Sequence, residues 1–143
     1  MKNRKGLFLL CLLPLLAACS ASAPDPEPGG NKMEIPYQVI AIDQLPPSLA
    51  KQAQQAIYSV KEQIQLLSAG KKMYVILSLG EKRMAGYEII VKKAEQQGSK
   101  LIIHASKKAP AENDFVAQVI TYPAVILVIQ PVPKVKHAEV KWL

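Results

Sequence analysis

The stretch MYVILSL, residues 73–79, is apolar at every position except Ser78 and is followed directly by Gly80. A short apolar run of this kind, rich in β-branched and aromatic residues, is typical of a strand that is buried on both faces. Alternating runs lie to its C-terminal side, and in one of them Leu101, Ile103 and Ala105 point to the same face. We therefore expect a sheet built around residues 73–79.

Further strands are predicted at residues 37–42, 87–94, 101–105, 115–121, 125–129 and 135–142. Residues 96–99, QQGS, are suited to a hairpin turn, and Pro131 and Pro133 mark a stiff turn before the last strand. His104 lies on the opposite side of its strand from Leu101 and Ile103, so it is expected to be solvated.

Residues 48–68 have the spacing of one amphipathic helix. Pro46 and Pro47 precede this segment, and Gly70 follows it as a stop signal. Its apolar face is formed by Leu49, Ala53, Ile57, Val60, Ile64 and Leu67. The expected fold class is α+β, mainly antiparallel β with about six to seven strands and this one helix. A sandwich and a curled open sheet both fit the pattern.

The sequence of the N-terminus is typical of an export signal. Lys2, Arg4 and Lys5 precede an uncharged run, residues 6–18, which Pro14 interrupts. A membrane-spanning helix needs roughly 20 apolar residues. The shorter run behind a basic start is typical of a secretory signal peptide, here residues 1–18.

Leu16-Ala17-Ala18-Cys19 resembles the lipobox of bacterial lipoproteins. The resemblance implies cleavage before Cys19 and a diacylglyceryl group on its sulfur, which would anchor the protein on the extracytoplasmic face of a cell membrane. Residues 19–32 then form a flexible Pro- and Gly-rich linker, and residues 33–143 a single domain. Since the other cysteine, Cys11, leaves with the signal, no cysteine nucleophile or disulfide is expected in the domain.

The remaining composition points away from catalysis. The net charge of +7 comes from basic residues scattered in pairs, without the concentrated basic and aromatic face of a nucleic-acid reader. His104 and His137 have no further ligands at metal-site spacing, and no phosphate-binding or dinucleotide motif is present. We expect a non-enzyme without metal or cofactor.

The loop at residues 80–87 is the candidate for partner binding. Two glycines at its ends can adopt positive φ, and a cationic and a sulfur side chain lie between them. Arg, Met and Tyr are enriched at interfaces. The candidate residues are Gly80, Arg83, Met84, Gly86 and Tyr87. In the alternative interpretation the glycines only permit a hairpin and Tyr87 belongs to the core.

Residues 73–130 resemble the C-terminal domain of the PrcB family of protease complex subunits, which are lipoproteins. The match is carried by Gly80, Gly86, Tyr87, Pro110, Tyr122 and Pro123, and the sequence departs from the family's usual Thr-Gly at Met84-Ala85. The resemblance implies a non-catalytic accessory subunit or partner of a secreted or surface protease. The loop is also similar to that of chagasin-type inhibitors, which implies a loop-based peptidase inhibitor as the alternative function.

Overall fold

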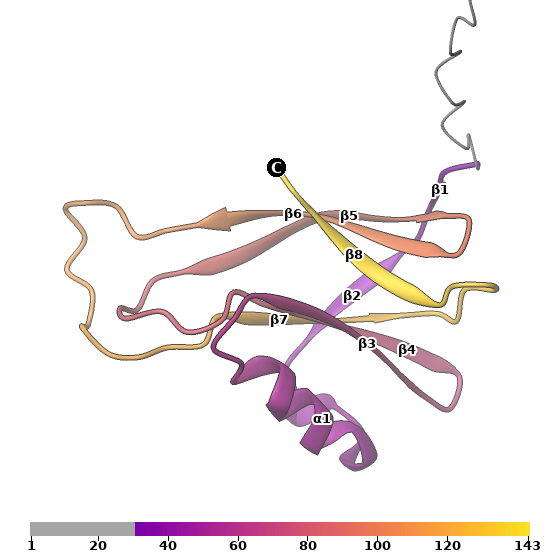
Figure 1. The fold of residues 1–143 in the computed structure, drawn as a ribbon, viewed down its shortest axis with the longest axis horizontal. Helices are drawn as coiled ribbons and strands as arrows, with labels where there is room; N and C mark the ends of the chain where they lie inside the picture. The colour runs from indigo at the N-terminus through magenta and orange to yellow at the C-terminus, as the bar shows by residue number, and fades with distance from the viewer. Residues whose placement is uncertain (1–30) are drawn as a thin grey trace, which may run out of the picture.

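The computed structural model describes residues 31–143 (Figure 1). The predicted signal peptide, the lipidation of Cys19 and most of the linker therefore lie outside the described residues. Within residues 31–143, no helix is both long enough and apolar enough to cross a membrane.

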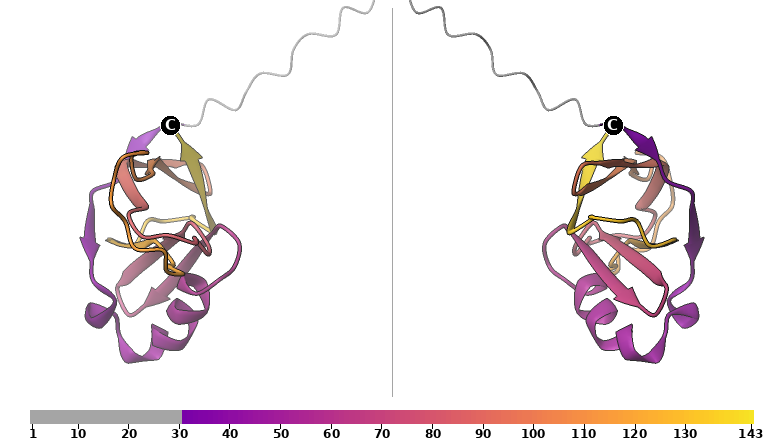
Figure 2. Two further views of the ribbon diagram at one scale, coloured as in Figure 1. Left: turned by 90° about the vertical axis from the view of Figure 1, so that its left-hand side faces the viewer. Right: turned by 90° about the vertical axis from the view of Figure 1, so that its right-hand side faces the viewer.

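Two four-stranded sheets and one helix form three layers (Figures 1 and 2). The first sheet has the order β1 (Met33–Glu34), β5 (Glu88–Gln97), β6 (Lys100–Lys108) and β8 (His137–Trp142). The second has the order β2 (Tyr37–Ile40), β7 (Ala124–Ile129), β4 (Lys72–Ser78) and β3 (Gln63–Ala69). Helix α1 (Pro47–Ile57), preceded by a 3-10 turn η1 (Ile42–Gln44), covers the face of the second sheet that points away from the first. The α+β fold class is thus confirmed, in its sandwich form.

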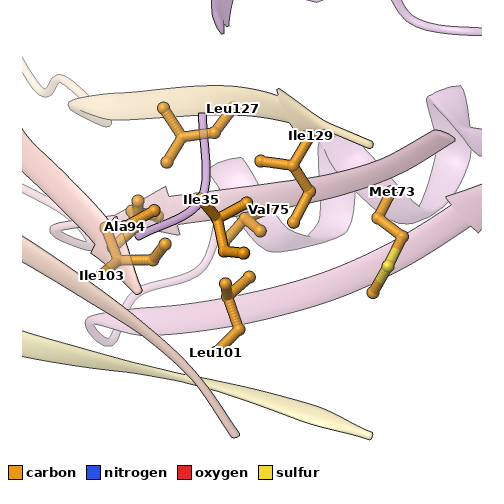
Figure 3. Packing of buried hydrophobic residues seen from close by; sticks show 9 residues of the cluster. Ile35, Met73, Val75, Ala94, Leu101, Ile103, Leu127 and Ile129 are labelled. Carbon is orange, nitrogen blue, oxygen red and sulfur yellow. The ribbon is translucent and has the colours of Figure 1, made fainter. Parts of the chain in front are cut away.

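Strand β4 holds the middle layer together, as the MYVILSL pattern predicts. Met73, Val75 and Leu77 point into the core between the two sheets, where Figure 3 shows the packing. Tyr74 and Ile76 point the other way, into the core under α1. Because both faces of β4 are buried, the near absence of polar residues along it follows directly.

The prediction of one helix over residues 48–68 is wrong beyond Ile57. At its end, the last carbonyl groups of the helix accept hydrogen bonds from side chains in place of further helical N–H groups. The Ser78 hydroxyl donates to Ile57 O (3.0 Å), and Gln63 Nε2 donates to Ala56 O (2.7 Å). Residues 63–69 then form β3, which pairs antiparallel with β4. The helical spacing was misleading because Val60, one of its positions, is 72% exposed in the intervening loop.

The strand predicted at residues 115–121 is absent from the structure. This segment belongs to an irregular run between β6 and β7 that forms a single isolated bridge, between Thr121 and Lys82. Apolar residues in the segment suggested a buried strand, yet Phe115 is fully exposed. The segment forms its hydrogen bonds with the loop at residues 80–87 instead of a sheet.

The last strand begins at His137 and pairs with β6 in parallel, so the first sheet is not wholly antiparallel. Its apolar side, Ala138, Val140 and Trp142, packs on the core between the sheets, as its alternation predicts. At the end of β8 the Trp142 indole donates to the Glu62 carboxylate, and the Lys107 ammonium lies over the indole ring at 4.4 Å. The contact joins β8 to the start of β3.

Candidate functional site

The loop at residues 80–87 lies at one end of the sandwich, beside the irregular run that connects β6 to β7 (Figure 1, left). We call residues 79–87 together with residues 109–123 the loop end. The opposite end carries the short turns between β3 and β4 and between β5 and β6.

Gly80 is a packing residue of this end. It has φ of +71°, and a Cβ atom there would lie 2.5 Å from Val60 O and 2.9 Å from Glu62 N. Its N–H donates to the buried Ser78 hydroxyl at 3.1 Å. Gly80 is therefore buried against the chain that leaves α1, and it is not itself presented to a partner.

Gly86 lies where the two segments of the loop end, residues 79–87 and 109–123, pack against each other. Its φ is +91°, and an added Cβ would lie 3.1 Å from Pro110 Cβ and 3.3 Å from Val116 Cγ1. Backbone bonds strengthen the contact: Ala85 N–H donates to Ala117 O (3.0 Å). The loop is therefore held against residues 109–121 along its length.

Three further bonds tie this loop to Thr121. Lys82 and Thr121 exchange backbone hydrogen bonds of 2.9 and 2.8 Å, and the Thr121 hydroxyl donates to Met84 O at 2.9 Å. Met84 and Ala85 are both half-buried. The Met84-Ala85 departure from the family pattern thus falls in a stretch whose backbone is fixed by other residues.

Of the five candidate residues, Arg83 is the side chain that the loop presents to solvent. Among the described residues it has no ion-pair partner. Tyr87 is half-buried, with the Lys82 ammonium 5.7 Å from the centre of its ring. The structure therefore separates the five candidates into one exposed cation, one half-buried aromatic residue, one half-buried methionine and two glycines that build the loop.

Sequence reasoning missed the apolar side chains of residues 109–121. Phe115, Val119 and Ile120 are all exposed there, although the sequence pattern assigned them to a strand. The signal that could have found them is the Pro-bounded, polar APAEND stretch before Phe115, which is typical of a loop.

A first pocket, which we call the tyrosine pocket, lies where the end of α1 meets the start of β7. It has a volume of about 270 Å³, and its lining includes Ile40, Ile57, Ala124 and Ile126. The rings of Tyr58 and Tyr122 also line it and meet edge to face, with centroids 5.3 Å apart. The result is a hollow that is open to solvent and has aliphatic and aromatic side chains in its lining.

The polar margin of the tyrosine pocket is formed by one hydrogen bond. The Tyr122 hydroxyl donates to Glu81 Oε2 at 3.2 Å. Burial raises the pKa of Tyr122, and the bond to the Glu81 carboxylate raises it further. The phenol therefore stays protonated and remains a donor to Glu81.

A second pocket of about 260 Å³ lies between the start of β5 in the first sheet and the start of β7 in the second, and we call it the intersheet pocket. It is lined by Tyr87, Glu88 and Ile89 from the start of β5 and by Pro123, Ala124 and Val125 from the start of β7. Ala124 lines both pockets, so the two lie on opposite faces of the same short stretch of chain.

His104 is not the solvated residue that the sequence predicts. It is buried, and its Nε2 lies 2.7 Å from Glu95 Oε1, while Lys93 Nζ lies 2.9 Å from Glu95 Oε2. The Lys93 and His104 hydrogen bonds lower the pKa of Glu95 to about 2. Alternation assigned His104 to the correct face of β6, but it does not show that Glu95 and Lys93 on β5 cover it there.

His137, by contrast, is half exposed, 3.7 Å from Glu139 Oε1. No group of three His, Cys, Asp or Glu side chains within residues 31–143 is arranged to hold a metal ion.

A family model described as PrcB C-terminal matches residues 73–130. No curated protein and no solved structure matches the chain. The matched segment runs from β4 to the end of β7, so it includes the whole loop end, Tyr122 and both margins of the intersheet pocket. The resemblance seen in the sequence is thereby confirmed: residues 73–130 match the PrcB C-terminal family model.

Proposed function

We propose that this protein is a membrane-anchored, extracytoplasmic lipoprotein that acts as a non-catalytic binding module, an accessory subunit of a secreted or surface protease. The match of residues 73–130 to the PrcB C-terminal family model supports association with a protease complex. The docking surface in this proposal is the loop end.

The observation that carries the proposal is the exposure of apolar side chains on a braced loop. Phe115 is fully exposed, and Val119 and Ile120 are 51% and 62% exposed. Exposed apolar side chains that gather in one segment mark interaction sites more often than scattered ones do. Because backbone bonds already hold this run against residues 82–85, little ordering is needed on binding.

The position of β1, the first described strand, supports a role of the loop end as the surface that meets the partner. Strand β1 lies at the opposite end of the molecule from the loop end (Figure 1). If Cys19 carries the lipid, the chain enters the domain at the membrane side, and the loop end lies at the far side of the domain. The loop end is then available to a partner in the surrounding space.

The inhibitor function requires the loop at residues 80–87 to enter an active-site cleft. Gly80 is buried and Gly86 packs on Pro110, which leaves Arg83 as the side chain that this loop offers. The structure therefore favours a broad docking surface over an inserted loop. Slowing of papain-like peptidases by an equimolar amount of the protein would reverse this preference.

The test is a capture experiment with the full chain in mild detergent. The wild type is immobilised and exposed to secreted and envelope proteins of the source cells, and retained proteases are identified by mass spectrometry. The double variant Arg83→Ala, Phe115→Ala should lose the protease. A matched control, Met33→Ala with Lys136→Ala, changes an exposed apolar and a basic residue outside the loop end and should retain it.

Two results would contradict the proposal. One is retention of no protease by the wild type; the other is equal retention by the wild type and the loop-end variant. Anchoring is tested separately: Cys19→Ser should abolish incorporation of labelled palmitate and release the protein from the membrane fraction.

A further inference from the structure

We propose that the start of β7, residues 122–124, is an open sheet edge that binds an extended segment of the partner by strand addition. The segment would continue the line of β2, place an apolar side chain in the tyrosine pocket and place a lysine or arginine beside Glu81. This inference rests on the proposed binding function and names the chemistry that the partner must supply.

The edge is open because β2 is shorter than β7, the strand with which it pairs. Its last pair is Ile40 with Ile126, after which the chain turns away into η1. Residues 122–125 therefore have no neighbouring strand on that side. On their other side they are paired with β4 and with the loop at residues 80–87.

The hydrogen bonds show which backbone groups face the open side. Pro123 O accepts from Leu79 N–H (2.9 Å), and Thr121 exchanges two bonds with Lys82. In an extended chain the N–H and C=O groups of successive residues point to opposite edges. Tyr122 and Ala124 therefore point their N–H and C=O groups to the open edge. Two donors and two acceptors are enough to pair with a short extended peptide.

The side chains agree with an extended stretch. Tyr122 and Ile126 line the tyrosine pocket, Pro123 and Val125 line the intersheet pocket, and Ala124, between them, borders both. Alternation between two faces has the period of a strand. Successive side chains of an added strand would alternate in the same way, so one pocket lies on each side of it. Strand addition gains its affinity from main-chain bonds and its specificity from such alternate pockets.

The tyrosine pocket selects an apolar side chain. Its floor is aliphatic, from Ile40, Ile57 and Ile126, and its wall is formed by the rings of Tyr58 and Tyr122. The Tyr122 hydroxyl already donates to Glu81. A leucine or phenylalanine side chain suits these surroundings, and a charged one does not.

Glu81 supplies the charge preference. Its carboxylate is half-buried, accepts from Tyr122, and has no lysine or arginine within ion-pair distance among the described residues. Residues two apart on a strand lie on the same face, roughly 6.6 Å from one another. The preferred segment therefore carries a basic residue two positions from its apolar one.

The chain's own N-terminal segment enters the described structure away from this edge. It leads into β1, whose pairing places Met33 opposite Gln96, at the end of β5 next to the hairpin turn. That is the end of the sandwich opposite to the loop end (Figure 1). We therefore take a separate chain, which supplies a basic residue for Glu81, as the occupant.

The experiment measures peptide binding to the purified full chain in detergent. A capped, fluorescein-labelled hexapeptide library, varied one position at a time, is screened by anisotropy up to about 1 mM. We expect selection of Leu or Phe at one position and of Lys or Arg two positions away. The selected peptide is then remade with single N-methyl groups, which remove one amide donor each. Methylation at alternate amides should weaken binding about tenfold, and methylation at the others should have little effect.

Two pairs of variants locate the site on the protein. Ala124→Pro removes an edge N–H that pairs with no strand of this chain, and proline is tolerated at such edge positions. It should weaken binding about tenfold, whereas Ala124→Ser, which keeps the N–H, should not. Glu81→Gln should remove the preference for a basic residue, and Glu81→Lys should reverse it to Asp or Glu.

Several outcomes would overturn the inference. They are binding of no library peptide, binding that is insensitive both to methylation and to Ala124→Pro, and self-association of the chain that Ala124→Pro abolishes in sedimentation. The last outcome would make a second copy the occupant of the edge. Failure of peptide binding while the Arg83–Phe115 capture experiment succeeds would remove the inference and leave the proposed function standing. If both fail, the binding function itself is wrong.

Discussion

The two ends of the sandwich are built on different principles. At the hairpin end, Gly70 and Gly98 have φ of +58° and +60°, and a Cβ atom at either would meet nothing within 4 Å. At the loop end, Gly80 and Gly86 have positive φ and are also packed against neighbouring chain. Glycine allows a turn at one end, and at the other it also allows close packing. The loop end is therefore the more sensitive to substitution, although it is the irregular one.

The largest effect that separates the two ends is expected from Gly80→Ala. The added Cβ would lie 2.5 Å from Val60 O at a residue with φ of +71°. We expect a loss of about 3 kcal/mol in the free energy of unfolding, from overpacking and backbone strain together. Urea denaturation measures it. The control is Gly98→Ala, which has the strain without the clash and should lose about 1 kcal/mol. Equal losses would remove the distinction between the ends.

The next effect tests how the loop end is attached to α1. Ser78 is buried; its hydroxyl donates to Ile57 O and accepts from Gly80 N–H. Ser78→Ala leaves both groups without this partner, so we expect a loss of about 2 kcal/mol. Ser68→Ala, at an exposed position on the neighbouring strand, should change stability by less than about 0.5 kcal/mol. A loss of the same size at Ser68 would show that the Ser78 bonds contribute nothing special.

A smaller effect, dependent on pH, is expected on β5 toward the hairpin end. The pKa of Glu95 is lowered to about 2 by the Lys93 and His104 hydrogen bonds. A carboxylate with a depressed folded-state pKa stabilises the fold above its ordinary pKa of 4.5, and that stabilisation is lost as the pH falls toward 2. Glu95→Gln should lower stability by about 1.5 kcal/mol at pH 7 and flatten the decline between pH 5 and pH 2.

Glu139 provides the matched control on the same sheet. It pairs with Lys100 at 2.8 Å, but both side chains are about half exposed. Because solvent screens this exposed pair, Glu139→Gln should change stability at pH 7 less than Glu95→Gln does. Denaturation curves at several pH values compare the two variants. An acid profile of Glu95→Gln that matches the wild type would show that this carboxylate does not stabilise the fold.

The smallest effect on stability is expected from Phe115→Ala. The side chain is fully exposed, so its removal should change the free energy of unfolding by no more than about 0.5 kcal/mol. The same variant should weaken capture of the partner protease. Loss of stability without loss of capture would assign Phe115 to the fold and not to the interface.

The sequence predicts the structure correctly where a single hydrophobic period, or a clear turn signal, runs through a segment. The buried strand at residues 73–79, the inward set Leu101, Ile103 and Ala105, and the turn after Gln97 all follow from local pattern and are confirmed. The pattern failed at residues 58–69, where spacings of three and four fitted a helix while β3 used Ile64 and Leu66 as one face of a strand. Pairing with β4 decided the outcome there, and a helical period does not reveal such a pairing.

The candidate site was predicted less well, and the reason is tertiary. Gly80 and Gly86 were correctly expected to have positive φ, but their packing against residues 60–62 and against Pro110 depends on segments distant in sequence. The exposure of Phe115 and the burial of His104 both depend on neighbouring residues from another strand or loop. The sequence pattern within one segment carries no information about such neighbours.

The place of β7 in its sheet has a consequence for how the chain reaches this structure. β7 lies between β2 and β4, yet it is made after both of them and after the whole β5–β6 hairpin. Until it arrives, the edges of β2 and β4 that it will cover are unpaired, which favours wrong strand pairing between molecules. Sheets that join distant parts of a chain also fold slowly, on the order of milliseconds to seconds. A chain that emerges N-terminus first must therefore keep β2 and β4 apart from other molecules until residue 129 has left the site of synthesis or export.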